Sequence, residues 1–460
     1  MASPSGSSFD EAKDFLARHP DIDAFDLVLV DANGVGRGKI IRRHELDAVY
    51  KNGRPFPTSI LGLDITGEDV HETGLIWETG DGDMRAWPVP GTLVPLHGTT
   101  RGQVLLSMYG LDGQPATSDP RHALARQIEN MAKRGLHPAG AFELEFFLLA
   151  NDRDGDGKVR PADAVLDGRK SRKTEVYSVD HLHGMEPLFA DIYAGAAAQG
   201  LPTETIISEY APGQYEITLR YRTDIMRAAD DLTLLKRLIR AQARRHGVTA
   251  CFMAKPFEKY AGSGMHMHVS LPSAVGENVF SEATPGAWKP ELLHALGGLL
   301  ETMAESMLIF APHANSWRRF VAQSYAPLAP TWGVNNRSVA LRVPEGDVKS
   351  RRIEHRPAGV DTNPHLVAAT VLAGILKGLD EKPDPGPEIT GNGYDKAPEA
   401  NADAPSDWRS AIEAAKASAF LKTALGEDMH RTFCAIKHAE YLRVARTVSE
   451  LDYHLYLHEV

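Results

Sequence analysis

The stretch "AFELEFFLLA", residues 141–150, is an apolar and aromatic run that carries two carboxylates, Glu143 and Glu145. Side chains of a β-strand alternate between its two faces, so residues two positions apart point the same way. The run therefore predicts a buried strand with both carboxylates on one face. Burying two neighbouring charges is costly unless positive groups lie opposite them. We expect this strand to form one wall of a charged site.

The composition of the chain argues against several classes of protein. Its 460 residues are 43% apolar and 24% charged, as in a globular protein, and the formal net charge of −11 argues against nucleic-acid binding. The two cysteines lack metal-ligand spacing, no apolar run is long enough to span a membrane, and the N-terminus does not resemble a secretory signal. We expect a cytoplasmic protein with no membrane partner.

The pattern of predicted elements changes along the chain. Short strands broken by Gly and Pro give way, near residue 116, to strands that alternate with longer helices. We therefore predict an α+β protein with a small N-terminal domain, residues 1–115, and a large second domain, residues 116–460. In the second domain the predicted strands are 139–149, 204–220, 248–254, 264–271, 337–343 and 352–356, and the predicted helices are 180–199, 224–246, 289–309, 364–379 and a pair after 405.

Three other segments place ionisable side chains in strand-like surroundings. "SEYAPGQYEITLR" carries Glu209 and Glu216, and "GSGMHMHVSL" carries His266 and His268 on one strand face. "RRIEHRPAG" carries Glu354. Each segment alone is explained as well by salt bridges or structural hydrogen bonds, but five glutamates and a histidine together favour a metal site. Carboxylates with one imidazole and no thiolate suit Mg²⁺ or Mn²⁺, and six ligands suit two ions. Two such ions are typical of phosphoryl transfer.

Arginines accompany these carboxylates. The segments "NSWRRF", "NNRSVALRVP" and "RRIEHR" are rich in arginine, the residue best suited to forked recognition of carboxylates and phosphates. A solvated surface cluster is the alternative, although Arg337 and Arg342 lie in a predicted strand. No phosphate-binding loop of the GxxxxGK[ST] or GxGxxG type is present, so a nucleotide would be bound in another way.

Six motifs occur together and in order along the chain: "FELEFF", "SEYAPGQYE", "KPFEKYAGSGMHMHVSL", "NSWRRF", "NNRSVALRVP" and "RRIEHRPAGVDTNPHL". With them the chain resembles the glutamine synthetases of the bacterial type over nearly its whole length. The resemblance implies a β-grasp N-terminal domain and a catalytic domain in which helices flank an antiparallel sheet. It also implies a dodecamer of two stacked six-membered rings, with active sites shared between neighbouring subunits.

The resemblance implies two divalent cations, Mg²⁺ or Mn²⁺, in each active site. One ion would be held by Glu145, Glu209 and Glu216. The other would be held by Glu143, His266 and Glu354. The family reaction uses ATP to phosphorylate the γ-carboxylate of L-glutamate, after which a nitrogen nucleophile displaces phosphate and leaves an amide.

The same resemblance implies roles for residues around the substrates. Arg319 would bind the α-carboxylate of glutamate, Gly262 would line that pocket, and Arg356 would face the γ-carboxylate. Arg337 would lie near the transferring phosphate. The residues expected to contact ATP are His268, Ser270, Arg342 and Arg352.

Two positions depart from the ammonia-using enzymes of the family. Those enzymes carry an Asp that binds ammonium and a Glu that takes its proton, where this chain has Pro57 and Tyr325. The metal and arginine motifs are kept, so we expect phosphorylation of glutamate with a nitrogen donor other than ammonia. "ILGLDITGEDVHETGL" and "ELDYHLYLHEV" resemble the γ-glutamylpolyamine and γ-glutamylputrescine synthetase branch, which implies putrescine or a related polyamine. Asp64 and Glu68 are candidates to bind the distal ammonium of a diamine.

Other functions stay open. The alternatives to putrescine as the amine substrate are ethanolamine, a short alkylamine and an arylamine. Pro57 and Tyr325 disfavour an ammonia-using glutamine synthetase, and six retained metal ligands disfavour a catalytically silent ring protein. Because an alkylammonium has a pKa of about 10.4, little neutral amine is present near pH 7. Activity is therefore expected to rise towards alkaline pH.

Overall fold

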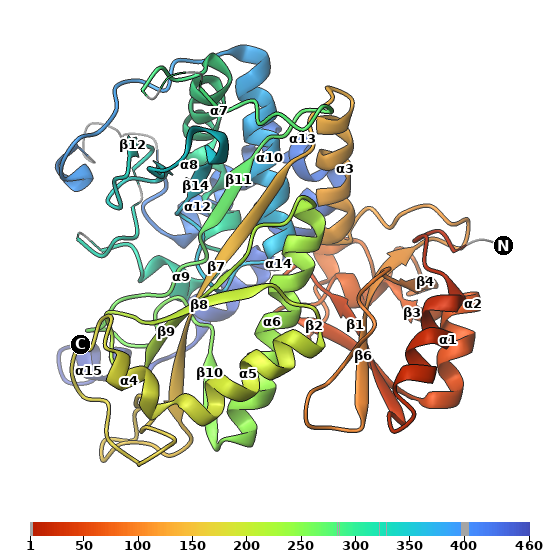
Figure 1. The fold of residues 1–460 in the computed structure, drawn as a ribbon. Helices are drawn as coiled ribbons and strands as arrows, with labels where there is room; N and C mark the ends of the chain where they lie inside the picture. The colour runs from red at the N-terminus through yellow and green to blue at the C-terminus, as the bar shows by residue number, and fades with distance from the viewer. Residues whose placement is uncertain (1–2, 283, 285, 322, 328, 397–403) are drawn as a thin grey trace.

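The computed structural model describes residues 3–282, 284, 286–321, 323–327, 329–396 and 404–460. Its strands form two sheets, one from residues before 110 and one from residues after 138 (Figure 1). Helices are few beside the first sheet and numerous around the second. This arrangement confirms the α+β class, while the domain boundary near residue 116 stays a prediction.

The N-terminal sheet has the order β2-β1-β6-β4-β3, with β5 paired to β6. Only β1 and β6 run parallel; the other pairs are antiparallel. Gly34, at φ +73°, allows the tight turn between β1 and β2. The strands are β1 (Ala24–Val30), β2 (Gly36–Arg42), β3 (Arg54–Pro57), β4 (Asp83–Pro88), β5 (Val94–Pro95) and β6 (Arg101–Tyr109). The helices beside it are α1 (Phe9–Arg18) and α2 (Leu46–Asn52).

The second sheet has the order β12-β13-β14-β11-β7-β9-β8, with β10 paired to one end of β7. It is antiparallel, as expected, except that β12 and β13 run parallel. Its strands are β7 (Ala139–Ala150), β8 (Thr203–Ser208), β9 (Gln214–Leu219), β10 (Val248–Cys251), β11 (Met267–Ser270), β12 (Trp332–Val334), β13 (Leu341–Val343) and β14 (Ile353–His355).

Two strand predictions were wrong in their extent. The predicted strand 204–220 is a hairpin, because Pro212 and Gly213, at φ +71°, turn the chain between β8 and β9. The predicted strand 337–343 begins only at Leu341, and Arg337 lies in the preceding loop. There the Asn336 side chain accepts a hydrogen bond from the Ser338 amide at 2.9 Å, which favours a turn over a strand.

Two predicted helices are also broken. The helix predicted at 180–199 is interrupted at Met185, because Pro187 in the first turn of α5 cannot continue a preceding helix. The helix predicted at 289–309 bends by 73° between α7 and α8. The helices of this part of the chain are α3 (Pro120–Ala132), α4 (Val179–Gly184), α5 (Glu186–Ala198), α6 (Ile225–Arg245), α7 (Pro290–Glu301), α8 (Met303–Phe310), α9 (Ala314–Trp317), α10 (Pro364–Glu381), α12 (Trp408–Ala417), α13 (Ala419–Leu425), α14 (Glu427–Arg446) and α15 (Glu450–Tyr456).

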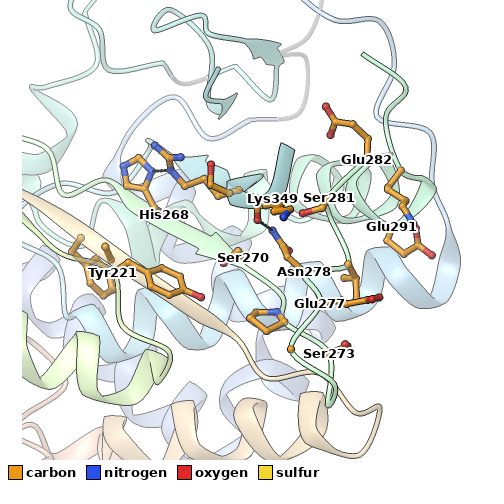
Figure 2. A pocket seen from close by; sticks show the side chains of 18 of the residues that line it. Tyr221, His268, Ser270, Ser273, Glu277, Asn278, Ser281, Glu282, Glu291 and Lys349 are labelled. Atoms are coloured by element: carbon orange, nitrogen blue, oxygen red, sulfur yellow. Dashed lines mark hydrogen bonds between the residues drawn. The ribbon is translucent and has the colours of Figure 1, made fainter. Parts of the chain in front are cut away.

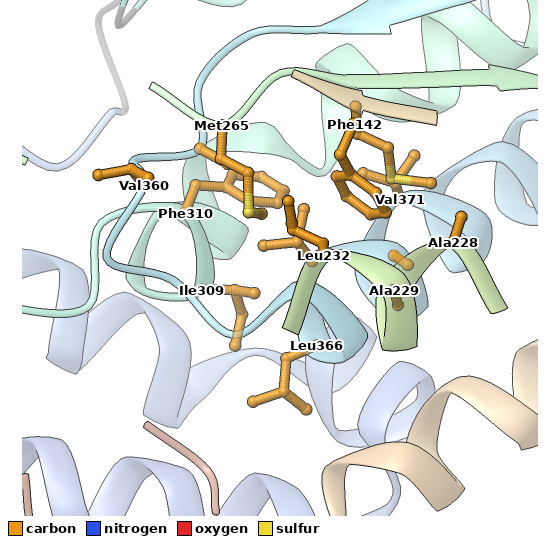
Figure 3. Close-up of a cluster of buried hydrophobic side chains, with 14 of the residues drawn as sticks. Phe142, Ala228, Ala229, Leu232, Met265, Ile309, Phe310, Val360, Leu366 and Val371 are labelled. Carbon is orange, nitrogen blue, oxygen red and sulfur yellow. The ribbon is translucent and has the colours of Figure 1, made fainter. Parts of the chain in front are cut away.

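Strand β7 divides the second sheet into an apolar and a polar face. Phe142, Leu144 and Phe146 are fully buried and belong to the large hydrophobic core, whereas Glu143 and Glu145 point the other way and are half-buried. Figure 3 shows Phe142 packed with side chains of α6, α8 and α10. Helices therefore cover the apolar face of the sheet, and the ionisable side chains lie on the opposite face.

No single helix within the described residues has both the length and the apolar character needed to cross a membrane. The bent pair α7 and α8 passes by length and composition alone.

Candidate active site

The pairing register of the second sheet gathers the predicted metal ligands on its polar face. Glu145 in β7 lies directly opposite Glu216 in β9, and His268 in β11 lies opposite Glu354 in β14. His266 immediately precedes β11, and Glu209 immediately follows β8. Like charges in directly opposed positions destabilise a sheet, so the pair Glu145–Glu216 is unfavourable for folding by itself. The sequence prediction that Glu143 and Glu145 share a face is confirmed.

Glu143 forms the centre of a hydrogen-bonded group. Its two carboxylate oxygens lie 2.9 Å from His266 Nδ1 and 2.8 Å from His268 Nε2. Arg352 Nε donates to His268 Nδ1 at 3.1 Å, so a neutral His268 carries its proton on Nε2 and donates it to Glu143. Burial opposes the ionisation of Glu143, but the hydrogen bonds from both imidazoles hold its pKa well below the usual range.

Glu354 is also compensated by positive groups. It pairs with Arg342 at 2.7 Å and with Arg356 through its other oxygen. Burial opposes its ionisation, but the charges of His268 and Arg356 lower its pKa to about 2. Arg342, predicted to contact ATP, is engaged with Glu354 and with Asn335.

The opposite side of the cluster has too much negative charge. Burial and repulsion from Glu143 and Glu145 raise the pKa of Glu216 to about 10, and burial and repulsion from Glu145 raise that of Glu209 to about 7. Glu145 accepts hydrogen bonds from the Gly264 amide at 2.8 Å and weakly from Gln214. Neither donor carries a charge, so these two hydrogen bonds do not neutralise the negative charge on this side.

The donor set fits hard divalent cations. Oxygen ligands with imidazole nitrogen and an excess of negative charge are the environment that Mg²⁺ and Mn²⁺ occupy in proteins. Within the described part of the chain, two triads bring ligand atoms within 4.8 Å of one another: Glu143, Glu216 and His266, and Glu143, His268 and Glu354. Neither triad is one of the two predicted sets. The difference arises because Glu143 is hydrogen-bonded to both histidines and so belongs to both groups.

A cavity of about 800 Å³ opens beside the cluster, on the side of Glu145, Glu209 and His266. Gly262 and Arg319 line it, as predicted, and these two residues pack closely against each other. A methyl group at Gly262 would lie 2.7 Å from Arg319 Cγ and 2.7 Å from the carbonyl oxygen of Ala254. Arg319 is 3% exposed and donates to the carbonyl oxygens of Pro357 at 2.7 Å and Arg356 at 3.2 Å.

Arg356, Tyr325 and Arg337 line the same cavity. Arg356 is buried, and its second guanidinium nitrogen lies 3.5 Å from the carbonyl oxygen of Tyr325. Tyr325 is 61% exposed and has the unusual φ of +55°. Arg337 is exposed, on the loop between β12 and β13. The cavity thus combines buried arginines at its base with exposed groups at its mouth.

A second cavity, of about 1180 Å³, lies on the other side of Glu143 (Figure 2). His268, Ser270 and Arg352, all predicted to contact ATP, line it together with Tyr221. The labelled side chains in Figure 2 run from His268 along β11 to Asn278 and Lys349. The two cavities meet at the carboxylate cluster: Glu143 and His268 line one, and Glu145 and His266 line the other.

Pro57 is not brought to either cavity. It ends β3, on the right of Figure 1, whereas β12 and β14 lie on the left. In one chain it therefore cannot act on the site that Tyr325 lines. Asp64 and Glu68, suggested for a distal ammonium, both pair with Arg443, at 2.9 Å and 3.0 Å, so within this chain their charges are already balanced.

Two cavity residues were missed by sequence reasoning. Gln214 donates to the carbonyl oxygen of Gly262 at 2.9 Å and to Ser263, which ties the glycine loop to β9. It stands within "SEYAPGQYE", so the motif itself was a signal. Tyr394 lines the same cavity beside the charges of Arg319 and Arg356, and burial raises the pKa of its phenol. No local pattern identifies it, because it is brought there from a distant turn.

Comparisons with known proteins agree with this site. Residues 117–456 match the family model described as glutamine synthetase, catalytic domain. The chain is 40% identical to the γ-glutamylputrescine synthetase PuuA of Escherichia coli (strain K12), over 97% of this chain and 94% of that protein. It is 33% identical to a glutamate–isopropylamine ligase of a Pseudomonas species, over 85% and 84%.

Its fold is similar to that of a solved GmaS/ADP complex, with a TM-score of 0.84 and 27% identity over 98% of this chain and 100% of that one. The fold, the cluster of five glutamates and two histidines, and the match over most of the chain lead to one conclusion. The chain belongs to the glutamine synthetase family.

Proposed function

We propose that this chain is an ATP-dependent ligase that joins the γ-carboxylate of L-glutamate to a primary amine, with putrescine or a related polyamine as the amine. One observation carries the proposal: an arginine-lined cavity and a larger second cavity meet at a carboxylate cluster, and Tyr325 stands where ammonia-using enzymes have a carboxylate. The two relatives described above, which are named for amine ligation, support it.

In this proposal the arginine-lined cavity binds glutamate. The buried Arg319 holds the α-carboxylate, and its two bonds to backbone carbonyls fix the guanidinium before the substrate arrives. Arg356 directs the γ-carboxylate towards the cluster, and Arg337 approaches the phosphate from the exposed loop. ATP lies in the larger cavity, with its phosphates near Arg352 and His268.

The carboxylates and His266 would hold two divalent cations, which neutralise negative charge on the phosphoryl group during its transfer. A γ-carboxylate oxygen of glutamate attacks the terminal phosphorus of ATP, and ADP leaves. The amine nitrogen then attacks the acyl phosphate carbon, inorganic phosphate leaves, and the nitrogen loses a proton to give the γ-glutamyl amide. The products are ADP, phosphate and the amide.

Tyr325 supports an organic amine over ammonia. A carboxylate binds ammonium and can accept its proton. An aromatic ring instead makes apolar contact with the methylene chain of an amine and a cation–π contact with its ammonium group. Among the described residues, Glu258 lines the same cavity and has no ion-pair partner, so it is available to a distal ammonium.

A second amine class also has support. The match to an isopropylamine ligase makes a short alkylamine the alternative substrate. The two differ in length and charge: putrescine has a second ammonium that needs a carboxylate, and isopropylamine does not.

The test is amine-dependent ADP release with glutamate, ATP and Mg²⁺, using putrescine, isopropylamine, ethanolamine and ammonium chloride in parallel. We expect putrescine to give the highest kcat/KM and ammonia to give the lowest. Comparable turnover with ammonia would refute the choice of an organic amine, and no stimulation by any amine would refute the ligase itself.

We also propose a dodecamer of two six-membered rings, located in the cytoplasm. In such a ring Pro57 of one subunit could reach the active site of its neighbour, which explains why it lies apart from Tyr325 in one chain. Twelve chains of 50.2 kDa give a particle of about 600 kDa, which sedimentation velocity distinguishes from a single ring.

A further inference from the structure

A third large cavity lies between the N-terminal sheet and helix α6. Its volume is about 1130 Å³, and its walls come from the β1–β2 hairpin, the loop before β6, α6, β10 and the segment before α10. It shares no lining residue with the two cavities of the candidate active site. The proposed ligase reaction gives it no role.

The charge of this α6 cavity is opposite to that of the whole protein. The chain has a net charge of −11, yet six basic and two acidic side chains line the cavity. The basic side chains are those of Arg101, Lys236, Arg237, Arg240, Arg244 and Arg245.

The two acidic side chains do not neutralise this excess. Asp26 is already shared between Arg101 and Arg237, the latter at 3.0 Å. Asp361 accepts a hydrogen bond from Ser316 at 2.7 Å and forms no ion pair within the described residues. Most of the positive charge therefore has no carboxylate partner among the residues that the structure describes.

Arg240 and Arg244 have no hydrogen bond or ion pair from their side chains to any residue that the structure describes. The Arg240 guanidinium lies 4.7 Å from the centre of the Phe252 ring, which fixes it towards the cavity wall. Both arginines are exposed, and partial desolvation with the charges of Arg237 and Arg244 lowers the pKa of Arg240. The arginines on this face therefore repel one another.

Lys236 extends the positive surface into the interior. Its ammonium donates to the carbonyl oxygens of Val360 at 2.5 Å and Thr362 at 3.5 Å, which are neutral acceptors. Burial, with the charge of Arg240, lowers its pKa to about 7. A buried cation bonded only to neutral groups is costly to maintain, and a bound anion would remove that cost.

We propose that the α6 cavity binds a small anion that carries two or more phosphate or carboxylate groups. Arginine forks are suited to both groups, and two free arginines one helical turn apart can contact two of them at once. A single chloride or phosphate would leave most of the excess charge unbalanced.

The test is calorimetric titration of the full-length protein with sodium pyrophosphate and, separately, trisodium citrate, in EDTA and at matched ionic strength. The variant Arg240→Gln/Arg244→Gln removes the two unpaired arginines. Its control, Arg18→Gln/Arg153→Gln, removes the same charge from exposed positions outside all three cavities. Melting temperatures establish that both variants are folded, without relying on the ligase activity.

We expect at least one anion to bind the wild type and the control equally, and to bind the cavity variant at least tenfold more weakly. Tighter binding of pyrophosphate assigns the site to phosphates, and tighter binding of citrate assigns it to carboxylates. Equal affinity of the two variants would overturn the proposal, because binding would then occur elsewhere. The proposal would also be overturned if neither anion binds the wild type and the sedimentation coefficient of the cavity variant differs from that of the wild type. That result would show that a neighbouring subunit occupies the cavity.

Discussion

The candidate active site and the α6 cavity carry opposite charges and are built on different secondary structure. Strand alternation places Glu143 and Glu145 on one face of a sheet, and pairing then adds Glu216. In α6, Lys236, Arg240 and Arg244 follow one another at intervals of four residues, which places them on one side of the helix. Both regions therefore set like charges side by side.

Each arrangement works against folding. Opposed like charges destabilise a sheet, and like charges four residues apart destabilise a helix by about 0.2–0.5 kcal/mol for each pair. Elsewhere the protein pairs its buried charges, as Asp230 with Arg121 and His365. Unpaired charge of one sign, gathered in a cavity, therefore indicates a ligand of the other sign. It indicates cations for the first region and an anion for the second.

The largest effect is expected from Glu216→Gln, which removes a cation ligand without changing shape. Amine-dependent ADP release should fall by at least about 10³-fold, because the cations lose an anionic ligand. The melting temperature in EDTA should rise near pH 7, because a raised pKa makes the folded chain bear the cost of protonating Glu216, whereas an amide needs no proton. Steady-state kinetics and thermal unfolding check both. A fall in the melting temperature would show that Glu216 stabilises the fold, and the excess negative charge would then not indicate a cation site.

A smaller effect is expected from Arg319→Gln, which removes a positive group from the edge of the acidic region. We expect kcat/KM for glutamate to fall about 10²-fold, because a buried charge-assisted contact to the substrate carboxylate is lost. The neighbouring Arg318 is exposed and lines neither active-site cavity, so Arg318→Gln is the matched control. Equal losses in the two variants would contradict the assignment of Arg319.

A change of about tenfold is expected from Tyr325→Glu, which adds a negative charge to the same cavity. The ratio of ammonia to putrescine turnover should rise, because a carboxylate at this position can bind ammonium and accept its proton. The backbone at Tyr325 has φ +55°, which is equally unfavourable for Tyr and Glu, so folding should not change. Tyr325→Phe is the control and should keep the preference for putrescine. An unchanged ratio in Tyr325→Glu would show that the preference is set elsewhere.

The smallest effect concerns the pH dependence of citrate binding in the α6 cavity. Burial lowers the pKa of Lys236 from 10.5 to about 7, so this ammonium is charged below pH 7 and becomes neutral as the pH rises. Affinity for citrate should therefore fall about three- to tenfold between pH 7 and pH 9, measured by calorimetry.

The charged groups that face Lys236 are Arg240 and Asp361. His97 and His313 also line the cavity. The variant Lys236→Met should bind citrate with little pH dependence. A pH dependence that persists in this variant would assign the effect to another group.

The parts of the fold that sequence reasoning predicted best are those with long, regular patterns. Strand β7 extends one residue beyond the predicted 139–149, and α6 lies within one residue of the predicted 224–246. The prediction failed at Arg337, because the hydrogen bond from Ser338 to Asn336 favours a turn in an apolar segment. The sequence did not show that Glu143 is shared by two groups of possible ligands, because that position depends on hydrogen bonds to both histidines.

The sequence by itself determined that ionisable residues share one strand face, that the chain resembles the glutamine synthetases, and that two expected carboxylates are absent. These conclusions follow from alternation and from motif identity, which are local properties of the chain. Only the tertiary structure decided that Glu145 opposes Glu216, that Tyr394 enters the cavity, and that Arg240 of α6 meets Phe252 and has no carboxylate partner among the described residues. Those contacts join residues far apart in the chain, and the burial that shifts their pKa values exists only after the sheets and helices have packed.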